Sequence, residues 1–388
     1  MSEFVINVSD YISTMCYSVL RLEPYTSCEN KCLYCYGRWY WTTNEVKPRF
    51  FILKLFRRIA EELSSKKLMM PFRLATLSEP LQDIEKKVKI SYGLMEIAMK
   101  YKMPIILSTK STLITKEPWH SLILRLSDEN LILVQMTLVT LDTELFKKIE
   151  PRAPPPEERI NALETLASEG VPIAVRLQPL IPGYSDEADV VESMIRQVSA
   201  SGVRHVILEY LRATKDDLMR LSYIIKNMKM NVWTSYSIAE EGLLKPSLRY
   251  RINKLREVRS ICEKYKVRLF TCKEGLFHLD SYGDCCGIYM MRNIMLRPTL
   301  REVWRVVMKR GRMSISEVVK ELGGDYMFGE KLSPLPRIIR KPMRNHEKRL
   351  IKCISDGARL RRITPLLKVD KGYLMAQPVD PSSAISQG

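Results

Sequence analysis

The sequence lacks long hydrophobic runs and contains little histidine. No apolar stretch reaches about 18 uncharged residues, the length that crossing a bilayer requires. The first twenty residues have neither a basic region nor an uninterrupted apolar run, so they do not predict a signal peptide. Only four histidines occur in 388 residues, which leaves few nitrogen ligands for a conventional zinc site. We therefore expect a cytoplasmic protein without a membrane span, whose thiols bind metals more often than they pair.

Acidic residues are also scarce relative to basic ones. The chain has 62 Lys and Arg against 44 Asp and Glu, a net charge of +18. Residues 291–372 hold about 21 of the basic residues and about 8 of the acidic ones, so most of the excess lies there. The excess predicts a polyanionic partner, with DNA or RNA as the candidate, and the alternative is a solvated basic surface.

A glycine-rich phosphate-binding loop is absent, although the pattern up to about residue 290 is that of an α/β protein. Short apolar runs alternate with helical patterns, which predicts parallel strands joined by helical crossovers. Six or more such repeats favour a complete or partial (β/α) barrel over a dinucleotide-binding sheet. The expected strands are 15–22, 72–77, 104–109, 131–138, 171–178 and 203–210, and the expected helices are 47–66, 82–101, 155–169, 186–201 and 244–266.

The chain divides by composition into three parts. We expect a barrel domain at 1–290, a basic and mainly helical extension at 291–376, and a disordered tail at 377–388. The extension has a helical pattern at 314–324, a proline-rich link at 332–345 and a second helical run at 347–363. A hairpin turn at Asp370–Gly372 follows. This order predicts either a small winged-helix-like unit or a lid packed on the barrel.

Three of the nine cysteines stand within eight residues, in the segment EPYTSCENKCLYCYGR. Cys28, Cys32 and Cys35 follow a C-x3-C-x2-C spacing, which indicates a metal, a cluster, or a redox pair with a spare thiol. Structural zinc would need a fourth ligand nearby, and a redox pair would not need Cys28. A [4Fe–4S] cluster needs four ligands and the loop offers three, so one iron would stay open to a reactive ligand.

Five segments together resemble the radical S-adenosylmethionine (SAM) superfamily, in its spore-photoproduct-lyase-like branch. The cysteine segment is similar to that family's cluster loop, with an aromatic residue before the third cysteine. The other four segments, at 76–91, 106–117, 140–171 and 177–190, resemble successive parts of the same branch in the same order. The resemblance covers about residues 20–285 and implies a partial barrel of the radical SAM type.

The resemblance also implies the cofactors, a [4Fe–4S] cluster and SAM. It implies that one-electron reduction, by a partner such as ferredoxin or flavodoxin, cleaves SAM to methionine and a 5′-deoxyadenosyl radical that takes a hydrogen from the substrate. The substrate could be a nucleic acid, in a lyase or modification reaction of the DNA-repair type, or a protein, peptide or metabolite. A rival of another class is an iron–sulfur protein that binds nucleic acid or senses redox state.

The resemblance places the site on this chain and leaves the catalytic residues unidentified. Cys28, Cys32 and Cys35 would ligate three irons. The SAM-binding residues would be Tyr34 beside the adenine, Ser78 and Glu79 near the amino group, Lys110 on the carboxylate and Thr137 within hydrogen-bonding distance. Simpler alternatives are a helix cap for Ser78 and Glu79, a surface position for Lys110 and a strand position for Thr137.

One feature of that branch is missing. Spore photoproduct lyases are thought to return hydrogen through a cysteine near the end of the second strand, where this chain has Thr76 and Ser78. We therefore do not expect repair of thymine spore photoproduct itself.

A second cysteine group lies at Cys272, Cys285 and Cys286. It has three interpretations: an auxiliary cluster or zinc site with His278 as fourth ligand, buried core thiols, or a hydrogen donor that reaches the site from the far side of the barrel. The remaining cysteines, Cys16, Cys262 and Cys353, are expected in the core.

Overall fold

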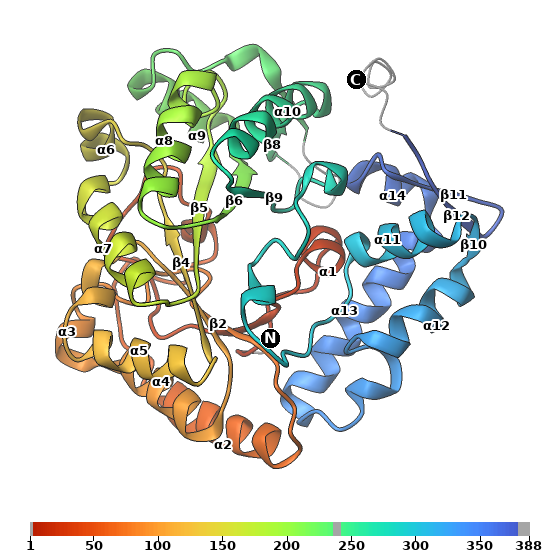
Figure 1. The fold of residues 1–388 in the computed structure, drawn as a ribbon, viewed down its shortest axis with the longest axis horizontal. Coiled ribbons are helices and arrows are strands. Elements are labelled where there is room, and N and C mark those ends of the chain that lie inside the picture. Colours follow the sequence, from red (N-terminus) through yellow and green to blue (C-terminus); the bar gives the residue numbers. More distant parts are fainter. Residues whose placement is uncertain (1–2, 236–241, 379–388) are drawn as a thin grey trace.

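The computed structural model describes residues 3–235 and 242–378, and its centre is a parallel sheet of seven strands (Figure 1). Every neighbouring pair in this sheet is parallel, so the chain crosses over between strands as the alternating pattern predicts. In spatial order the strands are β1 (Leu20–Leu22), β2 (Phe72–Leu74), β3 (Ile105–Thr109), β4 (Ile132–Thr137), β5 (Ile173–Leu180), β6 (His205–Tyr210) and β9 (Arg268–Thr271). The fold is the expected partial (β/α) barrel.

Helices cover the outside of this sheet. Each presents an apolar stripe to the strands, as in α2, where Ile52, Phe56, Ile59 and Leu63 are buried at helical spacing. The covering helices are α2 (Phe51–Ser65), α4 (Ile90–Tyr101), α5 (Trp119–Asp128), α7 (Pro156–Ser168), α8 (Ala188–Ala200) and α10 (Leu248–Lys264). Strands buried on both faces read as continuous apolar runs, which is why their positions could be predicted.

Shorter elements lie between these. They are α1 (Asp10–Met15), α3 (Glu85–Val88), α6 (Thr143–Ile149), α9 (Lys215–Ile224) and the antiparallel pair β7 (Trp233–Ser235) and β8 (Leu244–Pro246). No described helix has the length and apolar character to cross a membrane.

Two sequence-based expectations about the barrel are wrong. The strand expected at 15–22 begins only at Leu20, because residues 10–15 form α1, whose first turn is capped by the Ser9 side chain. Strand β9 was not expected at all. Its four residues begin with the charged Arg268, which hides the apolar pattern.

The C-terminal extension packs around a second, smaller core that it shares with Tyr11 and Met15 of α1 and with Phe277. Its elements are α11 (Leu300–Arg310), β10 (Met313–Ser314), α12 (Ile315–Asp325), α13 (Arg337–Ser355), α14 (Gly357–Ile363), β11 (Leu367–Asp370) and β12 (Tyr373–Ala376). The expected proline-rich link is wrong in part, because α13 begins at Arg337 and continues through Pro342. The hairpin turn is confirmed, and β10 pairs with the edge of β12.

The order of elements in this extension is that of a winged helix, namely a helix, a short strand, two helices and a hairpin that pairs with the short strand, with α14 added. The same unit packs on the N-terminal segment, where the Ser13 hydroxyl and the Ile6 carbonyl each lie 2.8 Å from a ring nitrogen of the buried His346 (Figure 1). The domain limits at 290 and 376 remain predictions, and the tail from residue 379 lies outside the described residues.

Candidate functional site

A cavity of about 620 Å³ occupies the inside of the barrel. Side chains from strands β1 to β6, from the loop after β1 and from the residues directly after β9 line it. Active sites of (β/α) barrels are built from residues at the carboxyl ends of strands. Every residue for which the sequence predicts a cluster or SAM contact lines this one cavity.

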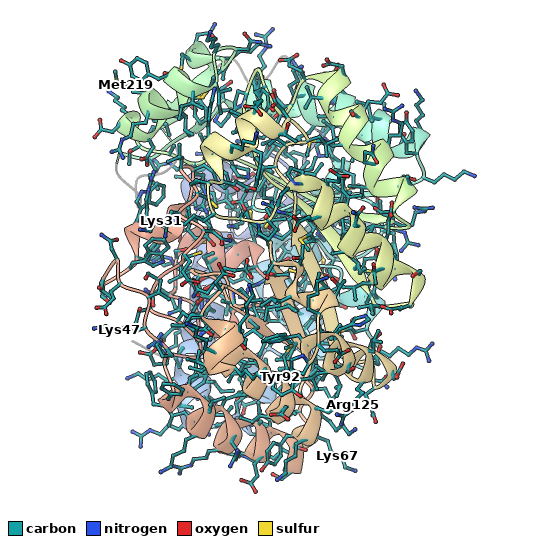
Figure 2. The ribbon with its side chains drawn as sticks, turned by 90° about the vertical axis from the view of Figure 1, so that its left-hand side faces the viewer. Lys31, Lys47, Lys67, Tyr92, Arg125 and Met219 are labelled. Atoms are coloured by element: carbon teal, nitrogen blue, oxygen red, sulfur yellow. The ribbon has the colours of Figure 1, made fainter. Side chains whose placement is uncertain are left out.

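The cysteine loop is held by hydrogen bonds to two other segments. The Glu29 amide donates to Gln82 Oε1 over 2.7 Å, and the Ile84 amide donates back to the Glu29 carboxylate over 3.2 Å. On the other side the Leu33 amide donates to the Ile149 carbonyl over 3.0 Å. Figure 2 shows Lys31, at the centre of the loop, on the surface, whereas the thiols lie toward the cavity. The loop therefore places Cys28, Cys32 and Cys35 together at the cavity mouth.

Gly37 allows this loop to lie against the end of β2. A side chain on Gly37 would bring its Cβ within 2.6 Å of the Leu77 carbonyl oxygen, so no larger residue fits. The Gly37 amide also donates to Cys35 Sγ over 3.3 Å. Backbone donors to sulfur tune the potential of an iron–sulfur cluster, so this contact suits a ligand thiolate.

The chemistry of the three thiols fits a cluster. Burial raises the pKa of Cys28 and of Cys32 to about 12, so without a metal these thiols stay protonated near neutral pH. Bound iron would deprotonate them. Among the described residues, no three Cys, His, Asp or Glu side chains are arranged around a single metal ion. A cluster does not require that arrangement, because it binds each thiolate to a different iron.

Lys110 follows β3 and extends into the cavity near the cluster loop. Its ammonium lies 5.6 Å from the centre of the Tyr34 ring and 3.8 Å from the Glu150 carboxylate. Glu150 is buried, accepts a hydrogen bond from Tyr34 and forms an ion pair with Arg159 at 2.5 Å. Burial alone would raise the pKa of Glu150, but Arg159 and Lys110 hold it below its usual value. Lys110 is thus a partly buried cation and not a surface lysine.

Thr137 ends β4 and also lines the cavity. Its carbonyl accepts a hydrogen bond from Arg159 over 3.1 Å. The same guanidinium therefore connects the end of β4 with the Glu150 carboxylate, and through Glu150 with Tyr34.

Ser78 and Glu79 lie just after β2. The buried Glu79 carboxylate accepts hydrogen bonds from the Thr109 hydroxyl over 2.5 Å and from the Lys110 amide over 2.8 Å. The Ser78 hydroxyl donates to Glu23 over 3.3 Å, and neither residue caps a helix through its side chain. Glu79 thus fastens the ends of β2 and β3 together and positions Lys110.

Three residues that hold this site were missed from the sequence: Glu23, Glu150 and Arg159. Glu23 accepts hydrogen bonds from the Thr76 and Leu77 amides over 2.6 and 3.0 Å. The available signal was their position, since Glu23 follows the first strand and the pair 150 and 159 brackets the proline-rich turn after α6. Buried charges at such positions need partners, but the sequence does not say which.

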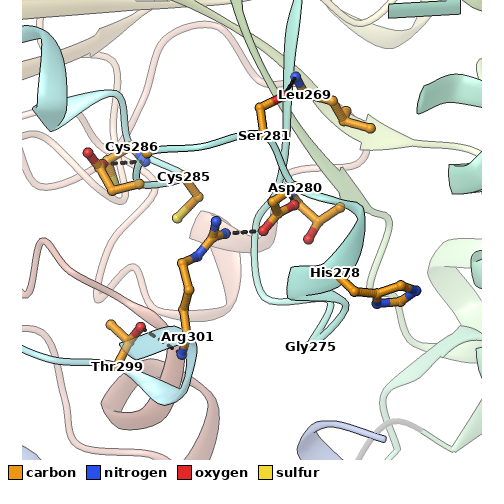
Figure 3. A network of polar contacts seen from close by, with 12 residues as sticks. Leu269, Gly275, His278, Asp280, Ser281, Cys285, Cys286, Thr299 and Arg301 are labelled. Atoms are coloured by element: carbon orange, nitrogen blue, oxygen red, sulfur yellow. Dashed lines mark hydrogen bonds and ion pairs between the residues drawn. The ribbon is translucent and has the colours of Figure 1, made fainter. Parts of the chain in front are cut away.

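The second cysteine group lines the same cavity. Cys285 hydrogen bonds to Cys286 and to Cys272, which directly follows β9, so two parts of the segment after this strand converge. His278 does not join them. Figure 3 shows its ring turned away from Cys285 and Cys286, with the Asp280–Arg301 ion pair on the side of the cysteines. The prediction of a zinc site with His278 as ligand is therefore wrong. The three thiols themselves line the cavity.

The other three cysteines differ from one another. Cys262 and Cys353 are buried in the barrel core and in the extension core, as expected. Cys16 is half-buried and lines the cavity, so the expectation of a core position is wrong for it.

Comparisons with known proteins agree with this geometry. An uncharacterized protein of Methanocaldococcus jannaschii is 26% identical over 167 residues, which are 42% of this chain and 61% of that protein. An uncharacterized protein of Mycobacterium bovis is 22% identical over 193 residues, 48% of this chain and 56% of that protein. The chain thus spans less than two thirds of the length of these relatives.

A solved structure shares the fold. A variant of spore photoproduct lyase with bound AdoMet and dinucleoside spore photoproduct superimposes with a TM-score of 0.50 at 12% identity, over 66% of this chain and 76% of that one. A sequence model of the radical SAM superfamily matches residues 22–194, which contain the cysteine loop and strands β2 to β5. Residues 22–194 of this chain therefore match a radical SAM domain, and the cofactors of that superfamily are a [4Fe–4S] cluster and S-adenosylmethionine.

Proposed function

We propose that this protein is a radical SAM enzyme in which Cys28, Cys32 and Cys35 hold the cluster and SAM lies over the strand ends beside Lys110. One observation supports this most directly. The three loop thiols and the strand-end residues Ser78, Glu79, Lys110 and Thr137 line one cavity, although they are separated by up to about a hundred residues in sequence. Core or surface roles for these residues would not require them to converge.

Several residues of the chain contribute to SAM binding in different ways. The Lys110 ammonium can pair with the SAM carboxylate, a charge-assisted contact that also orients the sulfonium. Glu79 binds the Lys110 backbone, and Glu150 lies beside its side chain, so the lysine is held in place. The Tyr34 ring closes one wall of the cavity. When bound, the cofactors supply one-electron cleavage of SAM to methionine and a 5′-deoxyadenosyl radical.

Reductive cleavage of SAM tests this proposal. The protein is purified and reconstituted without oxygen, reduced with dithionite in the presence of SAM, and 5′-deoxyadenosine is quantified by liquid chromatography. The proposal expects several turnovers that require both reductant and SAM. An iron–sulfur protein that only binds nucleic acid or senses redox state would yield no 5′-deoxyadenosine, and that result would reject the enzyme.

The substrate proposed for this enzyme is a nucleic acid. The support is the basic extension, whose hairpin carries the exposed Lys368 and Lys371 beside Tyr373. The Arg312 guanidinium lies 4.2 Å from the Tyr373 ring, which is 40% exposed. Basic side chains around an aromatic ring suit a phosphate backbone and a stacked base. A protein, peptide or metabolite substrate would leave this surface without a role.

Charge reversal on the hairpin tests the substrate class. In the full chain, Lys368→Glu with Lys371→Glu should weaken binding of a fluorescent DNA or RNA oligonucleotide and lower the salt dependence by about one unit per lost phosphate contact. The matched control, Lys54→Glu with Arg58→Glu, changes the same charge on the exposed face of α2. Equal loss in both variants would reject the hairpin as the binding surface.

A further inference from the structure

Below the strand ends, the cavity contains two arginines that share a neutral partner. Arg73 on β2 and Arg176 on β5 both donate to the Gln135 side-chain oxygen, over 2.7 and 2.9 Å. Arg73 also donates to the Ser108 hydroxyl over 2.6 Å and to Cys286 Sγ over 3.4 Å. Among the described residues, no carboxylate forms an ion pair with either guanidinium.

This arrangement is costly for the empty protein. Arg73 is buried, and two guanidiniums that meet at one amide oxygen repel each other and lose water without gaining a carboxylate as counter-charge. The nearby Lys273 differs, because it is paired with Glu209 at 2.9 Å. A bound anion between Arg73 and Arg176 would remove the repulsion and accept the donors that Gln135 cannot satisfy.

Gln178 provides an independent indication of a ligand. Its side chain is 9% exposed, lines the cavity, and has no hydrogen-bond partner for either its oxygen or its nitrogen. Gln178 lies two residues after Arg176, so both side chains face the same side of β5. The Gln178 amide has no hydrogen-bond partner, and the two arginines have no carboxylate partner among the described residues. Together they indicate that a polar group of a ligand binds between them.

The depth of this layer separates it from the proposed SAM site. Ser108 and Gln135 are paired across β3 and β4, and each stands two residues before Lys110 and Thr137. Two residues of parallel strand span about 6.6 Å. The guanidinium groups of Arg73 and Arg176, which are bonded at Ser108 and Gln135, therefore lie one layer further into the barrel than Lys110 and Thr137.

We infer that Arg73 and Arg176, with the Gln178 amide, bind an anionic group of the substrate, a phosphate or a carboxylate, one layer beneath SAM. The inference rests on the proposed function only in that SAM occupies the strand ends. In this arrangement the anionic group of the substrate enters the barrel and orients the rest of the substrate toward SAM.

Anion binding to the holoprotein tests this inference. The reconstituted protein with SAM is dialysed anaerobically against radiolabelled inorganic phosphate, and in a second arm against radiolabelled acetate. Arg176→Gln should weaken binding of the preferred anion at least about tenfold, the size of a lost charge-assisted hydrogen bond. Arg58→Gln on the exposed face of α2 removes the same charge and should change nothing. Preference for phosphate or for acetate identifies the kind of substrate group.

Two further variants protect the test against misfolding. Gln178→Leu removes no hydrogen bond from the chain, so it should fold normally and still weaken anion binding. Arg176→Lys keeps the charge and should retain part of the affinity. Iron content and SAM affinity are measured for each variant, and both should match the wild type.

Three results would overturn the inference. Wild-type protein could bind neither anion, in which case the thiols of Cys272 and Cys286 are the counter-charges of the arginines. Arg176→Gln could bind anions as tightly as the wild type. SAM affinity could fall in parallel with phosphate affinity, which would mean that the arginines hold the SAM carboxylate. Failure of the proposed enzyme is a separate result, namely normal anion binding without any 5′-deoxyadenosine.

Discussion

The two cysteine groups of this cavity are built in opposite ways. Cys28, Cys32 and Cys35 come from one loop, and in the described part of the chain their thiols form no hydrogen bonds with one another. Cys272, Cys285 and Cys286 lie in the segment that follows β9, and the Cys285 thiol hydrogen bonds to the other two. Separate thiols suit a cluster that binds each at its own iron, whereas thiols in contact share protons.

The electrostatic surroundings differ as well. Burial raises the pKa of Cys28 and of Cys32 to about 12. In the second group the hydrogen bond from Cys285 lowers the pKa of Cys272 to about 7 and also lowers that of Cys286. Cys28 and Cys32 thus need a metal to become anionic near neutral pH, whereas the lowered pKa of Cys272 favours its thiolate without one.

The largest expected effect comes from removing the loop thiols. The triple variant Cys28→Ala, Cys32→Ala, Cys35→Ala should keep the fold, because the loop lies outside the strands, and should lose the cluster and all SAM cleavage. Iron analysis, the visible absorption spectrum and 5′-deoxyadenosine measure the outcome.

The second trio is the control for that experiment. Cys272→Ala, Cys285→Ala, Cys286→Ala should retain about four irons per chain and the SAM-dependent spectral change. If the second variant lost the cluster and the first kept it, the assignment of the two groups would be reversed.

The sequence predicts a cluster at the first group and leaves three interpretations open for the second, for a physical reason. Ligands that lie in one loop have a spacing that is visible in the sequence. Lys110 and Thr137 can be recognised because they stand at the ends of apolar runs. Cys272 and Cys286 meet only because β9 joins the sheet, and β9 is too short and too charged at its start to be recognised.

The contacts inside the barrel could not be predicted from the sequence, for a related reason. In strands buried on both faces, inward and outward residues are equally apolar, so the sequence does not reveal their alternation. The meeting of Arg73 and Arg176 at Gln135 therefore could not be predicted from the sequence. Glu150 and Arg159 were missed because their partners are set by tertiary contacts.

The second largest effect concerns what holds the second group in place. Asp280 accepts a hydrogen bond from the Thr271 amide over 2.6 Å and pairs with Arg301 of α11, whose side chain is 3% exposed (Figure 3). Arg301→Met leaves a buried carboxylate without its partner and should lower the free energy of unfolding by about 3 kcal/mol. Chemical denaturation followed by circular dichroism measures this loss.

Arg305 is the matched control, one turn further along α11. It lies 3.6 Å from Glu302 and is 38% exposed, so Arg305→Met should cost less than about 1 kcal/mol. Iron content should stay normal in both variants, because the loop group does not depend on this ion pair. Equal destabilisation by the two substitutions would show that the Asp280 pair does not anchor the segment.

A smaller effect is expected at the SAM end of the cavity. Lys110→Met removes the proposed partner of the SAM carboxylate and should weaken SAM binding about tenfold or more, as for a lost charge-assisted hydrogen bond. Glu150 keeps Arg159 and Tyr34 as partners, so no buried charge is left alone. Isothermal titration with SAM measures the change.

Lys116→Met is the control for this lysine, since Lys116 is exposed six residues further along. Cluster content should be normal in both variants. Unchanged SAM affinity in Lys110→Met would contradict the assignment of Lys110 while leaving the cluster ligands intact.

The smallest effect is a pH dependence confined to the second group. With a pKa of about 7, Cys272 is mostly protonated at pH 6 and mostly a thiolate at pH 8, so its alkylation by iodoacetamide should rise about tenfold between these values and then level off. Cys16, which also lines the cavity, has its pKa raised to about 11 by burial and should react slowly throughout this range. Mass spectrometry of the cluster-loaded protein identifies the modified peptide, and Cys285→Ala, which removes the hydrogen-bond donor, should shift the Cys272 profile toward higher pH. A Cys272 rate that keeps rising to pH 9 in the wild type, or a Cys285→Ala profile identical to it, would show that the thiols of the second group do not share protons.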